Sequence, residues 1–456
     1  MPLLQPRSVA VIGASRDPKS VGYGVLKGLL HGCVLKSPFA KPFKGRIYAV
    51  NPNASEIMGV KCLASVKDAG DVELAVLCVP AKIVPAVLRE CAEKCVKAAI
   101  VVSAGFAESG EEGKKLQEEI VSICRDNNML LLGPNCLGVI RPSSSLNASF
   151  GLSMPPEGSM AFVSQSGALA DSVIDWSLEQ MYAFSLLASL GNSAGLNEAD
   201  LVDWLAMDEK TKAIALYLEG VKNGKEFMKA VRKAVSHGKK VFVLKGGREG
   251  AGLKAVSSHT AALAGSYPVF FAAMRQAGAT VVDSLEELFV LGDAVSKQPS
   301  TKNGVVIVTN GGGAGVLCAD YCQRCGVQLV ELHESTLEKL EKTGKMHRAY
   351  SRSNPLDIIG DALPDRYQAA LETLLAENYV HGAIVLQTLQ TMTDSMGDAK
   401  AVVAASRRHP GKPVLCVFMG GAYSKQGIKY LHENGVPNFQ DPLLAAKAMA
   451  TLVGKI

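Results

Sequence analysis

Short apolar runs alternate with helical patterns along the first third of the chain. Between the first two runs, apolar residues at 22–31 recur with the spacing of a helix. Continuous apolar strands separated by helices are typical of a parallel, doubly wound sheet, whose ligands bind at the carboxyl ends of the strands. We expect such strands at residues 8–13, 46–50, 72–79, 98–102 and 129–132.

The same alternation starts again twice further along the chain. Residues 141–157 are rich in Ser and Pro without periodicity, which predicts a connector, and residues 298–304 resemble a second boundary. Expected helices include 169–178, 268–277 and a segment from residue 316. Further strands are expected at 160–163, 184–187, 213–218, 241–244, 305–309, 382–386 and 414–418.

Composition narrows the class of protein. The chain has 456 residues, 48% hydrophobic and 20% charged, which suits about three globular domains. A net charge of +5 without a basic block argues against nucleic-acid binding, and the absence of about 18 consecutive apolar residues argues against a membrane span. Eleven cysteines, mostly within apolar runs, favour a reducing cytoplasm. Cys318, Cys322 and Cys325 lack a second ligand pair, so no metal site is expected.

Small residues and free amides follow each expected strand of the first series. These strand ends together predict a nucleotide-type site. The alternative is that the glycines only make tight turns. The candidate positions are Gly13, Ala14, Ser15, Asn51, Val79, Ser103 and Asn135.

Two familiar phosphate motifs nearly fit in this region. Residues 13–20 resemble a P-loop, but Pro18 replaces the second glycine and removes the backbone amide needed there. Gly22 and Gly24 are followed by Gly28, one position too late for the dinucleotide fingerprint, and lie inside an expected helix. Ordinary ATP or NAD binding by this domain is therefore disfavoured.

Two strand-to-helix turns are candidates for anion binding. Residues 164–168 (SQSGA) follow one expected strand, and residues 310–315 (NGGGAG) follow another in the last third of the chain. Turns of this kind point backbone amides and the positive end of a helix at whatever lies in front of them, and phosphate suits that position.

One histidine lies within a stretch of small and hydroxylated residues. Residues 256–266 (VSSHTAALAGS) fit neither apolar period, which predicts a loop carrying His259. Neutral imidazole is nucleophilic near pH 7, and the neighbouring hydroxyls could bond a phosphoryl oxygen. The alternative is a solvated surface histidine.

Several motifs, in order along almost the whole chain, resemble the α subunit of the ADP-forming acetyl-CoA synthetases. These acyl-CoA ligases are related to succinyl-CoA synthetase. The matching segments are SVAVIGAS, AVNPN, SAGFAE, GPNCLG, FVSQSGALA, YLEGVKNG, the SSHT histidine segment, TNGGGAGV and NPLDIIG.

The resemblance implies an α/β fold with three domains and a role for each candidate residue. It implies a Rossmann-like CoA-binding domain at 1–131, a flavodoxin-like domain carrying the phosphohistidine loop at 132–298, and a second flavodoxin-like ligase domain at 299–456. His259 falls on the phosphorylated histidine and Glu219 on the glutamate that holds its ring. The seven strand-end positions fall on coenzyme A contacts. The phosphate-binding positions are Ser164, Ser166, Gly167, Gly312, Gly313, Ala314 and Gly315.

The resemblance also implies an activity and a partner. The reaction converts acyl-CoA, ADP and phosphate into acid, ATP and coenzyme A, through an acyl phosphate and a phosphohistidine. No ATP-grasp domain is recognisable, so a separate β subunit carrying ADP or ATP with Mg²⁺ is expected, in an α2β2 assembly. The segment 255–266 should move between the subunits, and Ala261 stands where the family often has glycine.

Other functions stay open at this point. A coenzyme A-binding regulatory protein of the same fold would need no nucleotide domain, but it would have no use for both His259 and Glu219. A ligase for another acid such as succinate is compatible with every motif, because acyl specificity depends on a pocket formed by distant segments. An NAD-dependent dehydrogenase lacks its fingerprint.

Overall fold

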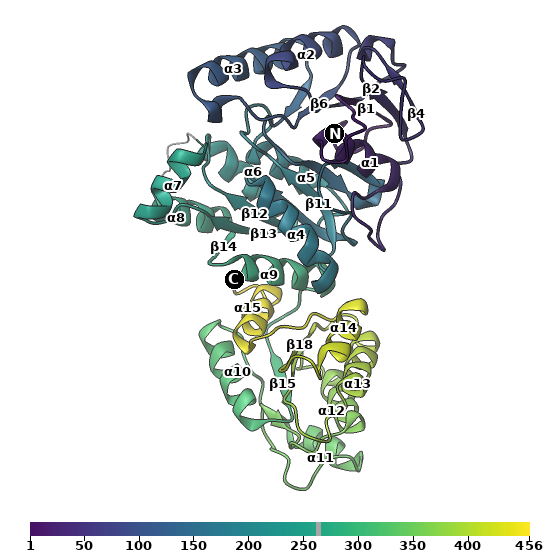
Figure 1. Cartoon of the computed structure of the whole chain (residues 1–456). Coiled ribbons are helices and arrows are strands. Elements are labelled where there is room, and N and C mark those ends of the chain that lie inside the picture. Colours follow the sequence, from purple (N-terminus) through teal and green to yellow (C-terminus); the bar gives the residue numbers. More distant parts are fainter. Residues whose placement is uncertain (261–265) are drawn as a thin grey trace. The chain divides into compact units, whose positions relative to one another are not determined.

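The computed structural model describes residues 1–260 and 266–456, with the side chains of residues 257–260 also left undescribed. The chain divides into two compact units, Met1–Leu285 and Glu286–Ile456 (Figure 1). Both units combine parallel sheets with helices, so the predicted α/β class is confirmed. The predicted division into three domains at 131/132 and 298/299 stays a prediction. No helix among the described residues is both long and apolar enough to cross a membrane.

The first unit begins with a seven-stranded sheet in the order β3-β4-β2-β1-β5-β6-β7. Its neighbouring strands are parallel apart from the antiparallel pair β3 and β4. The strands are β1 (Ser8–Ile12), β2 (Arg46–Val50), β3 (Glu56–Ile57), β4 (Val60–Leu63), β5 (Leu74–Leu77), β6 (Ala98–Val101) and β7 (Leu130–Leu132).

Alternate residues of β1 supply two separate cores. Val9 and Val11 belong to the cluster that includes α1 (Val21–His31), whereas Ala10 and Ile12 belong to the cluster of the opposite face. That second cluster contains buried residues of α2 (Val84–Glu93) and α3 (Glu111–Asp126). Because side chains point alternately to the two faces of a strand, helices cover both faces of this sheet, as the continuous apolar runs predict.

The second sheet of this unit has the order β14-β13-β12-β10-β11-β8-β9. Its last two pairings, β11 with β8 and β8 with β9, are antiparallel, and the others are parallel. The strands are β8 (Gly138–Arg141), β9 (Leu146–Ser149), β10 (Glu157–Ser164), β11 (Phe184–Ser189), β12 (Ala213–Leu218), β13 (Lys240–Lys245) and β14 (Thr280–Val282).

The predicted connector over residues 141–157 is wrong in its first half, because β9 is a buried strand of this sheet. Leu146 is fully buried, and so is the polar Asn147. The Asn147 side chain donates a hydrogen bond to the carbonyl of Gly32 at 3.2 Å and accepts one from Ser149 at 2.6 Å. Polar residues buried in this way have the composition of a loop but satisfy their hydrogen bonds through tertiary contacts.

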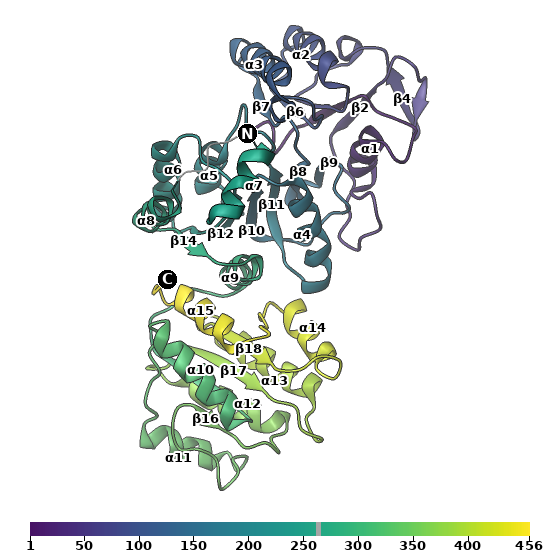
Figure 2. The ribbon, with the colours of Figure 1, turned by 60° about the vertical axis from the view of Figure 1, so that its left-hand side comes forward.

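Helices flank this sheet, and one of them replaces the predicted histidine loop (Figure 2). Residues 256–260 belong to α7, so the loop prediction is wrong for that part, and residues 261–265 lie outside the described residues. Val256 is buried, and a Cβ placed on Gly247 would lie 2.8 Å from its Cγ2. This packing of Val256 stabilises the end of α7, although the sequence there is rich in hydroxylated residues. The helices are α4 (Gly167–Gln180), α5 (Glu198–Met207), α6 (Gly224–Ser236), α7 (Gly250–Thr260) and α8 (Tyr267–Ala277).

The second unit contains a four-stranded parallel sheet in the order β16-β15-β17-β18. The views show α10 and α15 on one face and α12 and α13 on the other (Figures 1 and 2). The strands are β15 (Val305–Thr309), β16 (Leu356–Asp357), β17 (Gly382–Gln387) and β18 (Val414–Phe418). The helices are α9 (Leu285–Lys297), α10 (Gly312–Arg324), α11 (Glu334–Lys342), α12 (Pro364–Ala376), α13 (Ser395–Arg408), α14 (Lys425–Glu433) and α15 (Pro442–Leu452).

Candidate functional site

The loops that follow β1 and β2 meet at the carboxyl edge of the first sheet. The Asn51 side chain donates a hydrogen bond to the carbonyl of Ala14 at 2.7 Å. Gly13 has a φ of +88°, and a Cβ there would lie 2.7 Å from the carbonyl oxygen of Cys78. The Ser15 hydroxyl accepts the backbone N–H of Asp17 at 3.1 Å. Only glycine permits both this backbone conformation and this close approach.

The loops after β5, β6 and β7 meet at the same edge. The Ser103 hydroxyl donates to the carbonyl of Val79 at 2.5 Å, and the Asn135 N–H donates to the carbonyl of Ser103 at 3.0 Å. A Cβ on Gly13 would lie 3.0 Å from Val79, so this group adjoins that of the first two loops. The structure therefore brings together the seven strand-end positions that the sequence singles out.

Two turns of the chain repeat one local geometry. Ser164 is the last residue of β10. Its hydroxyl donates to the carbonyl of Ser166 at 2.8 Å and accepts the Ser166 N–H at 3.0 Å. Thr309 is the last residue of β15, and its hydroxyl makes the same pair of bonds with Gly311, both at 3.0 Å. A helix follows each turn, so in each case amides of a helix amino end face outward from a fixed loop.

The glycines of the second turn differ in how much space surrounds them. A Cβ on Gly312 would lie 2.9 Å from an Asp357 carboxylate oxygen, and one on Gly315 would lie 3.0 Å from Thr309. A Cβ on Gly313 would meet no other group within 4 Å, and Ala314 is buried. Helix α10 begins at Gly312, four residues before the predicted start at 316, so these residues form its first turn.

Glu219 lies directly after β12 and is held by the first of these turns. The Gln165 Oε1 atom accepts the backbone N–H of Glu219 at 2.6 Å and that of Gly220 at 3.0 Å. Its Nε2 atom donates to the carbonyl of Gly220 at 2.8 Å. These bonds fix the backbone of Glu219. Glu219 is 6% exposed, so its carboxylate has little contact with bulk water.

Tyr217 and Lys245 surround Glu219. Burial raises the pKa of Tyr217, and the charge of Glu219 and its hydrogen bond with the Tyr217 hydroxyl raise it further. Lys245 is 4% exposed and donates to the carbonyl of Glu219 at 2.7 Å. Burial lowers the pKa of Lys245, and the nearby Glu219 opposes that shift. The Tyr217 hydroxyl therefore serves the carboxylate of Glu219, while the buried Lys245 bonds to its backbone carbonyl.

The side chain of His259 lies outside the described residues, so its distance to Glu219 is not defined. Its backbone belongs to the last turn of α7, which begins shortly after β13. That strand pairs with β12 in the register Leu218 to Lys245, so the chain leading to His259 starts beside the residue that precedes Glu219.

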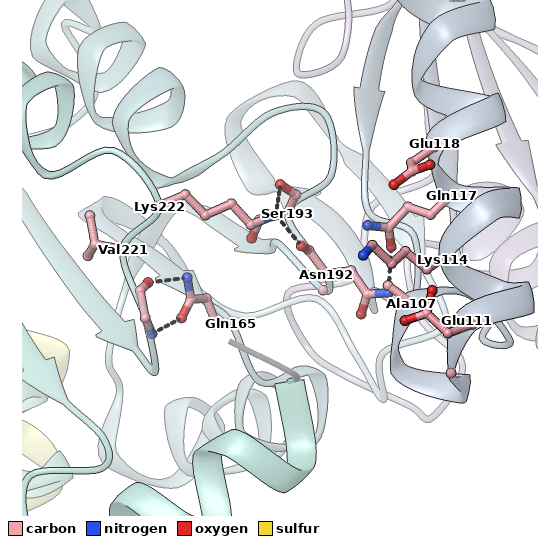
Figure 3. A pocket seen from close by; sticks show the side chains of 13 residues that line it. Ala107, Glu111, Lys114, Gln117, Glu118, Gln165, Asn192, Ser193, Val221 and Lys222 are labelled. Carbon is pink, nitrogen blue, oxygen red and sulfur yellow. Dashed lines mark hydrogen bonds between the residues drawn. The ribbon is translucent and has the colours of Figure 1, made fainter. Parts of the chain in front are cut away.

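A cavity of about 700 Å³ lies within the first unit (Figure 3). Figure 3 shows Gln165 and Lys222 on one wall and the side chains of α3, including Lys114 and Gln117, on the facing wall. The loop around Asn192 completes the lining between them. The cavity thus extends from the turn that holds Glu219 to the first sheet's helices.

Asn192 connects the two sheets of this unit at the cavity wall. Its Nδ2 atom donates to the Glu108 carboxylate and, at 2.9 Å, to Gln117. Its Oδ1 atom accepts a hydrogen bond from Asn135 at 3.3 Å. Burial would raise the pKa of Glu108, but the bonds from Asn192 and from the N–H groups of Gly105 and Phe106 outweigh it and hold that pKa below its usual value.

Sequence reasoning missed four side chains of this site. Gln165 was visible only as part of a turn, and Lys222 only as part of the segment after Glu219. Lys245 ends an apolar run, where a lysine that cannot reach solvent would have been a signal. Asn192 had no signal, because its role depends on tertiary contacts. Among the described residues, no group of three metal-ligating side chains is assembled.

Comparison with known families assigns each part of the fold. Residues 7–142 match a CoA binding domain, residues 157–295 match the succinyl-CoA ligase like flavodoxin domain, and residues 305–455 match the ligase-CoA domain. The three matches define the class of the protein by its domains, which are those of CoA ligases.

Individual relatives narrow this class. The chain is 40% identical to acetate–CoA ligase (ADP-forming) I of Archaeoglobus fulgidus, over 99% of this chain and 63% of that protein. It is 38% identical to the α subunit of acetate–CoA ligase (ADP-forming) II of Pyrococcus furiosus, over 98% of this chain and 96% of that one. The chain belongs to the ADP-forming acetate–CoA ligase family.

A solved structure agrees with this assignment. The dinucleotide-forming acetyl-coenzyme A synthetase 1 of Ca. Korarchaeum cryptofilum, in complex with phosphate and ADP, has a TM-score of 0.92 to this chain. The two are 33% identical, and the match covers 100% of this chain and 96% of the other. The resemblance seen in the sequence is thereby confirmed.

Proposed function

We propose that this chain is the α subunit of an ADP-forming acyl-CoA synthetase acting on acetyl-CoA or a similar thioester. The proposal rests mainly on the hydrogen bonds by which Gln165 holds the backbone at Glu219 and Gly220. Gln165 belongs to the turn before α4, which is a candidate anion site, and it lines a cavity whose other wall is the CoA-binding domain. A carboxylate so placed suits a phosphohistidine better than a surface role.

The reaction would proceed in three steps. Phosphate attacks the thioester carbonyl, the C–S bond breaks, and coenzyme A leaves as the thiol, which gives an acyl phosphate. A ring nitrogen of His259 then takes the phosphoryl group and releases the acid. Phosphohistidine finally transfers the phosphoryl group to ADP and yields ATP. The sum converts acyl-CoA, ADP and phosphate into acid, coenzyme A and ATP.

The proposed roles follow from the chemistry of each group. Glu219 would accept a hydrogen bond from the other ring nitrogen of His259, fixing its tautomer and stabilising positive charge on the ring. The amides at the start of α4 would bind phosphoryl oxygens through Ser164, Ser166 and Gly167, and those at the start of α10 would do so through Gly312, Gly313, Ala314 and Gly315. The same pattern of hydrogen bonds in the two turns supports the same kind of role for each.

The strand-end positions of the first sheet would bind coenzyme A. The match of residues 7–142 to a CoA binding domain supports this role. The close backbone approach at Gly13 leaves amides and small side chains, rather than bulky ones, at this edge. The residues concerned are Gly13, Ala14, Ser15, Asn51, Val79, Ser103 and Asn135.

We further propose that the nucleotide and its Mg²⁺ bind to a separate ATP-grasp β subunit, in an α2β2 assembly. The chain spans 63% of the length of the Archaeoglobus relative but 96% of a Pyrococcus protein named as an α subunit. The difference leaves room for a further domain that a partner chain would supply. All eleven cysteines are free thiols, which supports a cytoplasmic location.

Acetate is the favoured acid, and a different acid is the second candidate. Five relatives, including those above, are named acetate–CoA ligases, whereas a Nitrosopumilus maritimus relative, 34% identical, is named 4-hydroxybutyrate–CoA ligase. A coenzyme A-binding protein without turnover is less well supported, because it would not require the fixed Glu219.

The test is release of free thiol from acetyl-CoA by the chain together with its ATP-grasp partner. Release should require both phosphate and ADP and should be lost in His259→Ala. The matched control is His237→Ala, because His237 is exposed at the end of α6 and should leave the rate unchanged. Thiol release without phosphate, or at the normal rate in His259→Ala, would reject the proposal.

A further inference from the structure

Lys222 ties together two loops of the cavity wall (Figure 3). Its Nζ atom donates to the carbonyl of Asn192 at 3.1 Å and to that of Ser193 at 3.0 Å. The loop after β12, which carries Glu219, is thereby joined to the loop after β11. Lys222 is exposed, but its ammonium group bonds to these two carbonyls.

A buried carboxylate lies behind this lysine. Glu198, the first residue of α5, is 1% exposed, and its Oε2 atom has no hydrogen-bond partner in the described part of the chain. Its carboxylate lies close to the backbone N–H of Lys222. Burial raises the pKa of Glu198 and lowers that of Lys222, and in each case the charge of the other residue opposes the shift. Each residue therefore stabilises the charge of the other, with Glu198 buried and Lys222 at the surface.

The loop held by Lys222 is also the loop that contacts the CoA-binding domain. Asn192 offers its backbone carbonyl to Lys222 and its side-chain amide to Glu108 and Gln117. A continuous chain of hydrogen bonds thus runs from the segment next to Glu219 to the edge of α3. Gln165 holds Glu219 separately, through bonds that do not involve Lys222.

We propose that Lys222, supported by Glu198, is a positioning residue that sets the CoA-binding wall of the cavity relative to the wall that carries Glu219. The proposal rests on the proposed function and names a residue that couples its two halves. Without Lys222 the Asn192 loop loses two charge-assisted bonds, so the thioester should no longer meet the phosphate in reacting geometry. Phosphoryl exchange between ATP and His259 needs only the Glu219 wall and should continue.

The test compares two half-reactions in Lys222→Met, using the complete complex with the ATP-grasp partner. Labelling of His259 by ATP should stay within about twofold of wild type, whereas kcat/KM for acetyl-CoA should fall by about 10-fold to 100-fold, the loss expected from misplaced reactants. Lys222→Arg retains donors for both carbonyls and should recover part of the loss. The control is Lys225→Met, since Lys225 is exposed on the next helix and should change neither measurement.

Glu198→Gln provides the second arm of the test. It should impair the acetyl-CoA half-reaction, and adding it to Lys222→Met should cause less than the product of the two single losses, as for residues that act as a unit. If Lys222→Met does not fold, Lys222→Arg and Glu198→Gln carry the same comparison.

Three outcomes would overturn the proposal. An unchanged kcat/KM in Lys222→Met, or equal losses in both half-reactions, would show that Lys222 does not couple the two walls. Independent losses in Lys222→Met and Glu198→Gln would show that the two residues do not act together. In each of these cases wild-type labelling leaves the proposed function standing, whereas a folded wild-type complex without label would reject both.

Discussion

Gln165 holds Glu219 through the backbone rather than through its carboxylate. One amide side chain accepts the N–H groups of Glu219 and Gly220, at 2.6 and 3.0 Å, and donates to the carbonyl of Gly220 at 2.8 Å. Three bonds from one residue fix the peptide while leaving the carboxylate oxygens to other partners. Because Gln165 follows Ser164 at the end of β10, the same turn sets both the amide positions at α4 and the position of Glu219.

Gln165→Leu should slow phosphorylation of His259 while preserving the fold. The leucine has similar volume but leaves the N–H groups of Glu219 and Gly220 without their acceptor, at a cost of about 1–3 kcal/mol. That cost corresponds to about 5-fold to 150-fold in the single-turnover rate of labelling by ATP. A rate equal to that of wild type would show that the backbone of Glu219 is held by other contacts. Gln180→Leu, at the end of α4, is the matched control and should leave the rate unchanged.

Glu219→Gln should reduce the labelling rate more strongly, by about 100-fold to 1,000-fold, the range found when a group that stabilises developing charge is removed. The amide keeps the shape of the side chain but has no negative charge to stabilise the imidazolium. Binding of acetyl-CoA, measured by calorimetry, should be unchanged. If the variant instead loses acetyl-CoA binding with normal labelling, Glu219 belongs to the coenzyme A site.

Arg141→Met should destabilise the first unit. Arg141 is 1% exposed, bonds the Asp208 carboxylate at 2.8 Å and stacks on the ring of Trp204 at 4.9 Å. Removal of one partner leaves a buried charge uncompensated, which costs about 3–5 kcal/mol. The measurement is the free energy of unfolding in urea. Arg141→Met combined with Asp208→Leu should recover part of the loss, and no recovery would show that packing on Trp204 dominates.

Asp398 should make the stability of the second unit depend on pH. Asp398 is fully buried, accepts a hydrogen bond from the Gln387 amide, and burial raises its pKa from 3.8 to about 7. Its Oδ1 atom and the Gln387 Oε1 atom both lack partners in the described part of the chain. A protonated carboxyl could supply the missing donor between them.

The sign of this effect follows from the raised pKa. Between pH 4 and pH 7 the folded state binds the proton that the unfolded state has released, so this contribution to stability is full below about pH 4 and is lost as pH rises to about 7. The loss is at most about 4 kcal/mol, at 1.36 kcal/mol for each pKa unit. Asp398→Asn cannot ionise, so its stability relative to wild type should rise over this range.

The variant must be compared with wild type at each pH, because the buried His432 also makes stability depend on pH in this range. Burial and the charge of Lys297 lower the pKa of His432 to about 3, which makes stability rise with pH up to about 6.5. This opposite slope is present in both proteins and cancels in the difference. Parallel stability profiles for Asp398→Asn and wild type would contradict the assignment of a raised pKa to Asp398.

The strands that position the site can be predicted from the sequence because both of their faces are buried. Residues Val9 to Ile12 are apolar throughout, since alternate side chains contribute to different cores. The small residues after these strands are predictable for a different reason: glycine is required where Gly13 approaches a neighbouring loop. Parallel pairing then brings the loops to one edge without further information.

The features that were missed depend on tertiary partners. Buried Asn147 reads as part of a loop because its hydrogen bonds with Gly32 and Ser149 come from the folded structure. The end of α7 reads as a loop because its hydroxylated residues favour helix weakly, while Val256 is stabilised by packing. Lys222 and Glu198 lie 24 positions apart in the sequence, and neither alone indicates that the two interact.

The most direct test of the central claim is transfer of label from ATP to His259 and onward. The chain with its ATP-grasp partner is incubated with γ-labelled ATP, isolated, and then given acetate and coenzyme A. The account predicts a label on the chain that is stable to alkali, labile to acid, absent in His259→Ala, and discharged by acetate, with acetyl-CoA formed only when coenzyme A is also present. A properly folded complex that acquires no label, or that keeps it in His259→Ala, would contradict the account.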